Sequence, residues 1–417
     1  MRGVFIILDG VADLPTSALN NQTPLEAAKT PNLDEIAKKS KLDYCFPVKE
    51  GIAPQSHTAV LSLLGYDSST IPRGPLEAQG AGIKIRKGDL VLRTNFCTID
   101  SIKDGNILDK RAGRIFTKKE TKILARAINE NVKLPYPFEF HSTVQHRGIL
   151  IFRGGFSDNI TNADPFYGKG VAYQKEEAKI QFSRPMDDED DSKLSADLVN
   201  AFMRKSHEVL NNHPINIARA KKGLFAANFL NCREPGNSPI KLKKIKGKWL
   251  ALAIRPLENG IAKAVGMSLY YDRAVIPKIR GIDVYSSLHS SLKHASKAAV
   301  KMIRRNHKKY DYFYIHFKET DIPGHDNKPL EKVKMIELID YYFFSYLKKY
   351  LNGNNVIITS DHSTPCKLKS HSADPVPVLT YPNPSSKSPS NEQRFTEKFG
   401  LEGRKILGRS LLKENFF

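Results

Sequence analysis

The chain has 417 residues, of which 40% are hydrophobic and 26% are charged, and these proportions are typical of a globular protein rather than a disordered or membrane-spanning one. Lysine and arginine outnumber aspartate and glutamate by 65 to 44, giving a formal net charge of +21. A chain of this length exceeds what one compact core usually accommodates, so we expect two domains.

The first predicted element is the apolar run 4–8, which is typical of a buried strand in a parallel sheet and is followed directly by Asp9. Open α/β sheets bind their ligands at the carboxyl ends of the strands, so the position of this acid is notable. After Thr30, apolar residues recur at helical spacing over 33–37. The chain therefore begins with a strand, a loop and a helix.

Ser56 directly precedes the apolar segment 59–64, which predicts a helix ending at Gly65. At or near a helix N-terminus, free N–H groups and the helix dipole stabilise an anion. A serine hydroxyl becomes a nucleophile when a base or a metal lowers its pKa. The alternative is that Ser56 only caps the helix. Local sequence favours this alternative, and the metal-ligand candidates described below favour the nucleophile.

The middle of the chain, 73–248, contains short β-like segments such as 90–98 and 148–152, with glycine-rich turns between them. A helical pattern covers 194–210, and the acidic run 187–191 is expected to be a solvated loop. This stretch predicts an α+β domain.

Strand patterns of the first kind return at 311–317 and 355–359, and a long helical pattern covers 333–351 between them. This alternation predicts an α/β fold with a mostly parallel central sheet flanked by helices. The proline- and serine-rich stretch 382–391 predicts a turn-rich loop.

These patterns predict a discontinuous core domain formed by residues 1–72 and 249–417, with the α+β domain of residues 73–248 inserted into it. No segment approaches the length of a membrane span, and the run 4–8 is too short for a secretion signal. The four cysteines are scattered and form no CxxC pair, so we expect free thiols in a cytoplasmic protein.

Three groups of candidate metal ligands follow predicted strands. They are Asp9, then Asp321 with His325, then Asp361 and His362 with His371. Mixed carboxylate and imidazole ligands suit Mn²⁺, Zn²⁺ or Fe²⁺ better than Ca²⁺ or Mg²⁺ alone. Any one of these residues is more often a helix cap or a structural histidine, but together they can hold two ions that activate a nucleophile and clamp a phosphoryl group.

A phosphorylated or carboxylated substrate needs guanidinium or ammonium partners. The candidates are Arg73, Arg111, Arg114, His146, Arg147 and Lys318. For each arginine a surface salt bridge is an equally good interpretation.

The dense basic run 241–248 and the net charge of +21 are compatible with nucleic-acid binding or with steering of anions toward a cleft. The sequence has no helix-turn-helix, zinc-finger or RNA-recognition pattern. A generally basic surface is therefore the favoured interpretation, and we expect no nucleic-acid partner.

The sequence resembles the archaeal-type cofactor-independent phosphoglycerate mutases of the alkaline phosphatase superfamily. The resemblance spans nearly the whole chain, and its motifs occur in the order of the family. These motifs are L-D-G at 8–10, T-P-L-E-A-A-K-T-P-N-L-D at 23–34, S-H-T-A-V-L-S-L-L-G-Y-D at 56–67, R-G-P-L-E-A-Q-G-A-G-I at 73–83, D-K-R-A-G-R-I at 109–115, H-R-G-I-L-I-F-R-G at 146–154, H-F-K-E-T-D-I-P-G-H-D at 316–326, S-D-H-S-T-P-C at 360–366 and H-S-A-D-P-V-P-V at 371–378.

The resemblance implies an alkaline phosphatase-like core and the interconversion of 3-phosphoglycerate and 2-phosphoglycerate through a phosphoserine at Ser56, without 2,3-bisphosphoglycerate. It also implies two metal sites, with Mn²⁺ as the usual ion and Mg²⁺, Co²⁺ or Zn²⁺ as substitutes. One site would use Asp9, Ser56, Asp361 and His362, and the other would use Asp321, His325 and His371. Arg111 and Arg114 of the insert would hold glycerate while it reorients.

His57 departs from the family pattern, because the residue after the nucleophile is often acidic. The same metal chemistry would also serve a phosphatase or another phosphomutase of the superfamily, so this alternative stays open. An inserted domain that excludes water favours transfer over hydrolysis. The sequence leaves the oligomeric state undetermined, and an oligomer is compatible with it.

Overall fold

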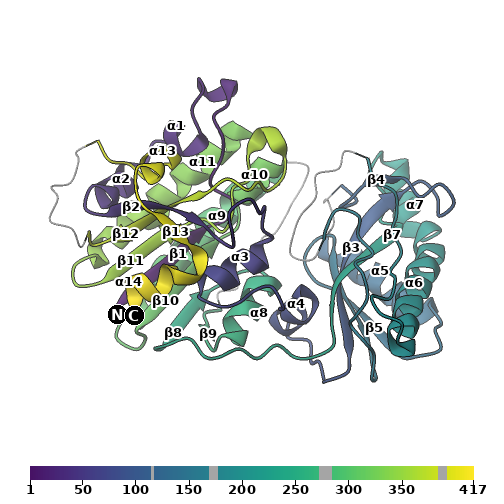
Figure 1. Cartoon of the computed structure of the whole chain (residues 1–417). Coiled ribbons are helices and arrows are strands. Elements are labelled where there is room, and N and C mark those ends of the chain that lie inside the picture. The colour runs from purple at the N-terminus through teal and green to yellow at the C-terminus, as the bar shows by residue number, and fades with distance from the viewer. Residues whose placement is uncertain (114–116, 169–176, 272–283, 384–391) are drawn as a thin grey trace.

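The computed structural model describes residues 1–113, 117–168, 177–271, 284–383 and 392–417. The described chain forms two β-sheets that lie side by side, each with its own helices (Figure 1). The first sheet has eight strands in the order β13-β2-β12-β11-β1-β10-β8-β9, and the second has five. This arrangement confirms the predicted α/β class with an additional α+β part.

The first sheet combines strands from both ends of the chain. Its strands are β1 (Gly3–Leu8), β2 (Lys41–Phe46), β8 (Trp249–Leu252), β9 (Ser268–Leu269), β10 (Tyr312–Phe317), β11 (Asn355–Thr359), β12 (Val376–Tyr381) and β13 (Lys405–Leu407). β1 lies between β10 and β11 and pairs with both in parallel, whereas β12 is antiparallel to its two neighbours. The carboxyl ends of β1, β10 and β11 therefore meet at one edge of the sheet, as predicted for a mostly parallel sheet.

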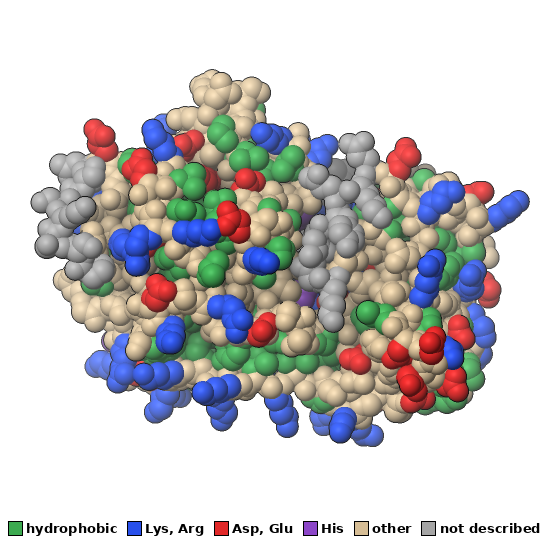
Figure 2. All heavy atoms as spheres, viewed as in Figure 1, with side chains coloured by type: hydrophobic (Ala, Val, Ile, Leu, Met, Phe, Trp, Pro, Cys, Tyr) green, Lys and Arg blue, Asp and Glu red, His purple; other side chains and the backbone are tan. Residues whose placement is uncertain are grey.

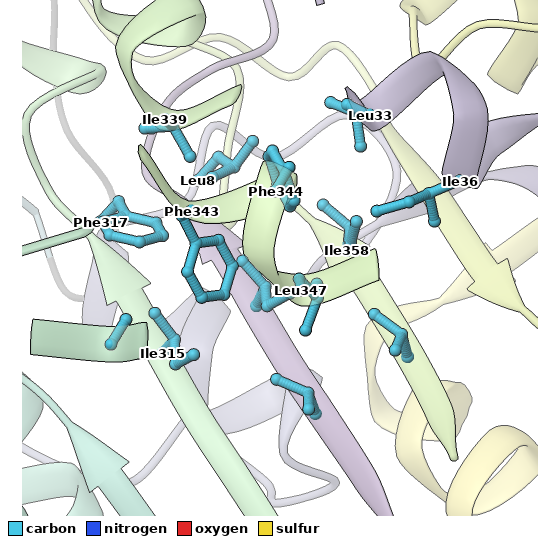
Figure 3. Close-up of a cluster of buried hydrophobic side chains, with 14 of the residues drawn as sticks. Leu8, Leu33, Ile36, Ile315, Phe317, Ile339, Phe343, Phe344, Leu347 and Ile358 are labelled. Carbon is cyan, nitrogen blue, oxygen red and sulfur yellow. The ribbon is translucent and has the colours of Figure 1, made fainter. Parts of the chain in front are cut away.

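Hydrophobic side chains cover both faces of this sheet. The alternation along β1 sends Val4, Ile6 and Leu8 to one face and Phe5 and Ile7 to the other. The helices on the first face are α1 (Pro24–Ala27), α2 (Pro31–Ala37), α9 (Val284–Asn306), α11 (Pro329–Ile339) and α12 (Ser345–Leu347). The helices on the second face are α3 (Ser56–Leu63), α8 (Pro256–Ala264) and α14 (Leu411–Phe416). Figure 3 shows the first face, where side chains of β1, β10 and β11 pack against the helices above them.

The helical pattern predicted over 333–351 is interrupted in the structure by a π-helical turn, Asp340–Phe344, between α11 and α12. This turn buries Phe343 and Phe344 in the core (Figure 3). It also brings the Asp340 carboxylate to the start of α2, where it accepts a hydrogen bond of 2.7 Å from the backbone N–H of Leu33. The π-helical turn thus supplies a hydrogen-bond acceptor to the N-terminus of α2, whose cap residue Thr30 makes no side-chain cap bond.

The second sheet is antiparallel and carries the helices of the α+β part. Its strands are β3 (Leu90–Ile99), β4 (Ile107–Asp109), β5 (Phe138–Ser142), β6 (Arg147–Phe152) and β7 (Phe229–Gly236), and the helices are α5 (Lys118–Asn131), α6 (Asp190–Asn211) and α7 (Pro214–Lys221). The acidic run 187–191 is only partly the predicted loop, because Asp190 and Asp191 form the first turn of α6. Acidic side chains are favourable there because they face the positive end of the helix dipole.

Two helices cross closely where the sheets meet. A Cβ atom on Gly80, at the end of α4 (Arg73–Gly80), would lie 1.6 Å from the carbonyl oxygen of Pro256, and one on Gly260 of α8 would lie 1.9 Å from that of Leu76. Only glycine allows the two backbones to approach this closely. α4 also contacts β3 and β7, so it links both sheets. The division of the chain at residues 72 and 248 stays a prediction.

The remaining expectations from the sequence concern membrane spans, the cysteines, the basic surface and the loop at 382–391. None of the helices in the described part of the chain is long and apolar enough to cross a membrane. All four cysteines are buried and free, as expected. Lysine and arginine side chains line the lower edge of the molecule in the view of Figure 2. Most of the loop predicted at 382–391 lies outside the described residues.

Candidate active site

Ser56 is the first residue of α3, and Gln55 is the N-cap. The interpretation of Ser56 as a plain helix cap is therefore wrong, and its hydroxyl is directed elsewhere. The Ser56 Oγ atom lies 3.2 Å from Nε2 of His362, a residue that is far away in the sequence. The predicted helix N-terminus is confirmed, and its first hydroxyl faces one of the candidate metal ligands.

The first group of candidate ligands lies where two adjacent parallel strands end. Asp9 follows β1, and Asp361 and His362 follow β11. The Nε2 atom of His362 is 3.7 Å from Oδ1 of Asp9 and 3.3 Å from Oδ2 of Asp361. Ligand atoms of all three residues lie within 4.8 Å of one another.

The second group lies beside the first. Asp321 and His325 stand one turn apart on α10 (Asp321–His325), and Nε2 of His325 is 3.3 Å from Oδ2 of Asp321. The Nε2 atom of His371 is 3.9 Å from the other Asp321 oxygen, and Asp321, His362 and His371 also place ligand atoms within 4.8 Å of one another. The structure thus brings all six predicted ligands and Ser56 into one cluster, although each residue's role stays a prediction.

Two carboxylate oxygens of this cluster fit a metal site. Oδ1 of Asp9 and Oδ2 of Asp361 are buried and have no hydrogen-bond partner among the described residues. An unsatisfied buried oxygen of a charged group is costly, and a divalent cation between the two carboxylates would remove that cost.

The histidines are oriented for the same purpose. The Nδ1–H of His371 donates to the carbonyl oxygen of Pro54 at 2.7 Å, and the Nδ1–H of His325 donates to that of Lys369 at 3.0 Å. Each bond holds the ring through Nδ1 and directs Nε2 to Asp321, as in metal-binding histidines whose other ring nitrogen donates to a carbonyl oxygen.

The protonation states of the cluster also suit cation binding. Burial raises the pKa of Asp9, but the charge of Lys318 and the hydrogen bond with His316 outweigh burial and hold the pKa below its ordinary value. Burial and the neighbouring charge of Asp9 raise the pKa of Asp361 well above its ordinary value. Burial lowers the pKa of His362 to about 4, so this imidazole is neutral at pH 7. A cation would allow both carboxylates to ionise together and would find a neutral imidazole beside them.

Lys318 lies between the candidate metal ligands and the cavity. Its ammonium group contacts the carboxylate of Asp9 and lies 3.3 Å from Oε1 of Glu258, while it also lines the cleft next to Ser56. Burial lowers the pKa of Lys318, but the charges of Asp9 and Glu258 outweigh burial and raise it, so the side chain stays charged. Asp9, Glu258 and His316 form a third group of potential ligands, and the Lys318 ammonium already supplies the cation there.

A cavity of about 110 Å³ opens in front of Ser56 and extends between the two sheets. Its wall includes five of the six predicted substrate-binding residues. These are Arg73, Arg111, His146, Arg147 and Lys318. Arg114 lies outside the described residues.

Sequence reasoning missed three further arginines in this wall, Arg93, Arg233 and Arg255. Arg255 lies three residues after the end of β8, at the N-cap of α8, and a charged residue shortly after a buried strand is similar to the signal that identified Asp9. Arg93 and Arg233 pair with each other across β3 and β7, and only the strand that contains Arg93 was predicted, as the segment 90–98. A charged residue that interrupts a run of buried strand positions is the signal that could have found them.

The arginines of the cavity wall are incompletely paired, and all but Arg111 and Arg147 are buried. Glu77 accepts from Nε of Arg73 at 3.0 Å and lies 2.9 Å from Nε of Arg93. Burial, together with the charge of Arg93, lowers the pKa of Arg147 to about 9. Nε of Arg147 and Nη1 of Arg233 are buried without a hydrogen-bond partner among the described residues. A cluster of buried cations with unsatisfied donors is suited to bind an anion.

Comparisons with known proteins agree with this geometry. The family model described as 2,3-bisphosphoglycerate-independent phosphoglycerate mutase matches residues 37–216. The protein of that name from Thermococcus gammatolerans is 38% identical over 386 residues, which is 91% of this chain and 87% of the relative. The one from Pyrococcus furiosus is 36% identical over 96% of this chain and 91% of the relative.

Solved structures give the same result. A protein from Pyrococcus horikoshii superposes with a TM-score of 0.74 at 30% identity, covering 99% of this chain and 96% of that one. The cofactor-independent phosphoglycerate mutase from Thermoplasma acidophilum superposes with a TM-score of 0.57 at 26% identity, covering 100% and 99%. This chain therefore belongs to the 2,3-bisphosphoglycerate-independent phosphoglycerate mutases.

Proposed function

We propose that this chain interconverts 3-phosphoglycerate and 2-phosphoglycerate, with Ser56 as the group that carries the phosphoryl between the two positions. The observation that carries this proposal is the place of Ser56 Oγ, 3.2 Å from Nε2 of His362 and on the wall of the arginine-rich cavity. The nucleophile, the candidate metal ligands and the anion-binding side chains thus share one space.

The first metal ion would be held by Asp9, Ser56, Asp361 and His362, and the second by Asp321, His325 and His371. Mn²⁺ is the expected ion, and Mg²⁺, Co²⁺ or Zn²⁺ are substitutes to be tested. Two such ions would supply Lewis-acid stabilisation of the serine alkoxide and of the phosphoryl oxygens. The unsatisfied buried oxygens of Asp9 and Asp361 support the first site, and the bonds from Nδ1 of His325 and His371 to carbonyl oxygens support the second.

In the reaction, Ser56 Oγ forms a bond to phosphorus while the bond from phosphorus to the 3-oxygen of glycerate breaks. The proton that leaves the serine hydroxyl ends on that glycerate oxygen. The 2-hydroxyl of the glycerate then attacks the phosphoserine, and Ser56 regains a proton. No bisphosphorylated cofactor is consumed, because the enzyme stores the phosphoryl group itself. The reaction is an isomerisation by intramolecular phosphoryl transfer.

Glycerate must stay bound while its two oxygens exchange places. The lining of the cavity supports a role for its arginines in this task, because Arg73, Arg93 and Arg233 are buried and Arg147 is half-buried in its wall. Guanidinium groups bind carboxylates with two parallel hydrogen bonds, which fixes orientation as well as charge. Residues 73–248, as an inserted domain over residues 1–72 and 249–417, would also keep water from the phosphoserine.

The test is incubation of the purified protein and Mn²⁺ with 3-phosphoglycerate, without 2,3-bisphosphoglycerate, coupled to enolase. Ser56→Ala should abolish activity. The matched control is Ser62→Ala, which removes a buried hydroxyl from the same helix without touching the cavity. Formation of 2-phosphoglycerate by the wild type and the control, but not by Ser56→Ala, supports the proposal. Release of free phosphate in place of 2-phosphoglycerate would identify a phosphatase.

A further inference from the structure

Glu234 adopts an unusual backbone conformation on β7. β7 carries one more residue than β3 between the Arg93–Arg233 pair and the Val91–Gly236 pair, which is a β-bulge at Glu234. The φ angle of Glu234 is +54°, in the left-handed region that costs a residue other than glycine about 1–2 kcal/mol. Bulges and strained residues of this kind often direct a side chain at a functional site.

The Glu234 carboxylate reaches the two residues on either side of the nucleophile. Its Oε1 accepts a hydrogen bond from Nε2 of Gln55 at 3.2 Å, and its Oε2 lies 3.7 Å from Nε2 of His57. The side chains of His57 and Glu234 are only 1% and 5% exposed. One carboxylate from the second sheet therefore contacts both neighbours of Ser56 on the first turn of α3.

The bulge also connects this contact to the cavity. The backbone N–H of Glu234 donates to Oδ1 of Asn162 at 2.8 Å, which fixes the bulge in place. The preceding residue, Arg233, lines the cavity, and its guanidinium lies 3.2 Å from the centre of the Tyr167 ring. Arg233 therefore lines the cavity, and the next residue of the same strand, Glu234, contacts the start of α3.

We infer that Glu234 is a positioning residue that holds Ser56 in its reactive orientation through Gln55 and His57. The inference rests on the proposed mutase function. Phosphoryl transfer requires the attacking oxygen to lie in line with the bond that breaks, and a misplacement of about 1 Å can cost about 100-fold in rate. The first turn of α3 receives no side-chain cap bond, because the amide of its N-cap residue, Gln55, reaches Glu234 and the carbonyl oxygen of Gly168.

Loss of the carboxylate should therefore affect the rate of transfer more than substrate binding. In Glu234→Ala we expect kcat to fall by about 10- to 100-fold and KM for 3-phosphoglycerate to change by less than about threefold, because the arginines remain. Glu234→Gln should retain most of the activity, because its amide oxygen can still accept from Gln55. A loss of general stability alone would not separate kcat from KM in this way.

The experiment compares wild type, Glu234→Ala, Glu234→Gln and the control Asp197→Ala, which changes an exposed acid on α6 of the same part of the chain. Each is assayed for kcat and KM with Mn²⁺, and thermal unfolding confirms that each variant is folded. Hydrogen exchange at the amides of residues 55–58 is followed by mass spectrometry without substrate. Gln55→Ala removes the other end of the same contact and serves if Glu234→Ala does not fold.

A lower kcat with an unchanged KM, rescue by glutamine and faster exchange at residues 55–58 would support the inference. The effects of Gln55→Ala and Glu234→Ala should also be less than additive when combined, since both remove one contact. Wild-type kcat and exchange rates in Glu234→Ala would overturn it. If the wild type itself makes no 2-phosphoglycerate, the proposed function fails, and unchanged exchange in the variant would separately reject the positioning role.

Discussion

The imidazole rings of His362 and His371 are stacked, with centroids 3.6 Å apart and an angle of 18° between the ring planes. His362 lies three residues after the end of β11, whereas His371 lies further along the loop that leads to β12. The stacked rings lie where the two groups of candidate ligands adjoin. Two ions bound to these groups would be neighbours, as required for both to contact one phosphoryl group.

The first prediction concerns His371, one of the two stacked rings. His371→Ala should lower bound Mn²⁺ from two ions to one per chain, because Asp9, Asp361 and His362 keep the other site. His294→Ala is the control, because His294 is exposed on α9 and belongs to neither group of candidate ligands. The measurement is metal content by mass spectrometry after dialysis. Equal metal content in both variants would contradict the assignment of His371 as a ligand.

The second prediction concerns Glu77, which lies between Arg73 and Arg93. Burial raises the pKa of Glu77, but the two guanidinium charges outweigh burial and lower the pKa to about 2. Glu77→Gln leaves two buried cations without their counter-charge, and breaking a buried ion pair in this way typically costs about 3 kcal/mol or more. Chemical denaturation should show this loss in the free energy of unfolding. A change below about 1 kcal/mol, the usual range of a surface pair, would mean that the arginines find other partners.

The third prediction separates substrate binding from catalysis at Arg233. Its guanidinium stacks on the ring of Tyr167 and faces the cavity. Arg233→Lys keeps the charge but loses the planar group, so KM for 3-phosphoglycerate should rise about 10-fold or more while kcat changes less. Arg184→Lys, at an exposed position of the same part of the chain, should leave both constants unchanged. An unchanged KM in Arg233→Lys would remove Arg233 from the substrate-binding set.

The fourth prediction is a pH dependence of stability. Burial raises the pKa of Glu397 from 4.5 to about 7, in spite of the hydrogen bonds that its carboxylate accepts from Thr23 and from the backbone N–H of Asp13. Between these two pKa values the folded state holds a proton that the unfolded state has lost. The contribution of Glu397 to stability is therefore fully present below about pH 4.5 and is lost as pH rises to about 7.

Glu397→Gln should remove this pH dependence, because the amide does not ionise: its oxygen can accept from the backbone N–H of Asp13 while its NH2 group donates to the Thr23 hydroxyl. Thermal unfolding of wild type and variant at pH 5 and pH 8 is the measurement. We expect similar melting temperatures at pH 5 and a higher one for the variant at pH 8. A constant difference between the two proteins at both pH values would show that Glu397 titrates normally.

The cluster of candidate ligands could be predicted from the sequence because its members follow strands. In a parallel sheet, residues that end adjacent strands must meet, so Asp9 and Asp361 are brought together by the pairing of β1 with β11. His325 follows from Asp321 by helical spacing. The start of α3 was predicted from a different signal, the apolar segment 59–64 that follows Ser56.

The second-sheet side of the site could not be predicted in the same way. Arg93 and Arg233 lie within strands, and whether a strand residue faces solvent, core or cavity depends on its partner strand. The bulge at Glu234 depends on the register between β3 and β7, whose residues are more than a hundred positions apart. Local sequence contains neither the register nor the fit of α4 against α8 through Gly80 and Gly260.

The central position of β1 also has a consequence for how the protein is made. Both of its neighbours belong to the last part of the chain, since β10 begins at Tyr312 and β11 at Asn355. All five strands of the second sheet lie between Leu90 and Gly236, so they can pair while the ribosome is still adding the C-terminal third. β1 has no partner strand until β10 and β11 have been made, and Asp9 cannot meet Asp361 before then. A nascent chain would therefore complete the arginine-bearing second sheet before it brings Asp9 next to Asp361.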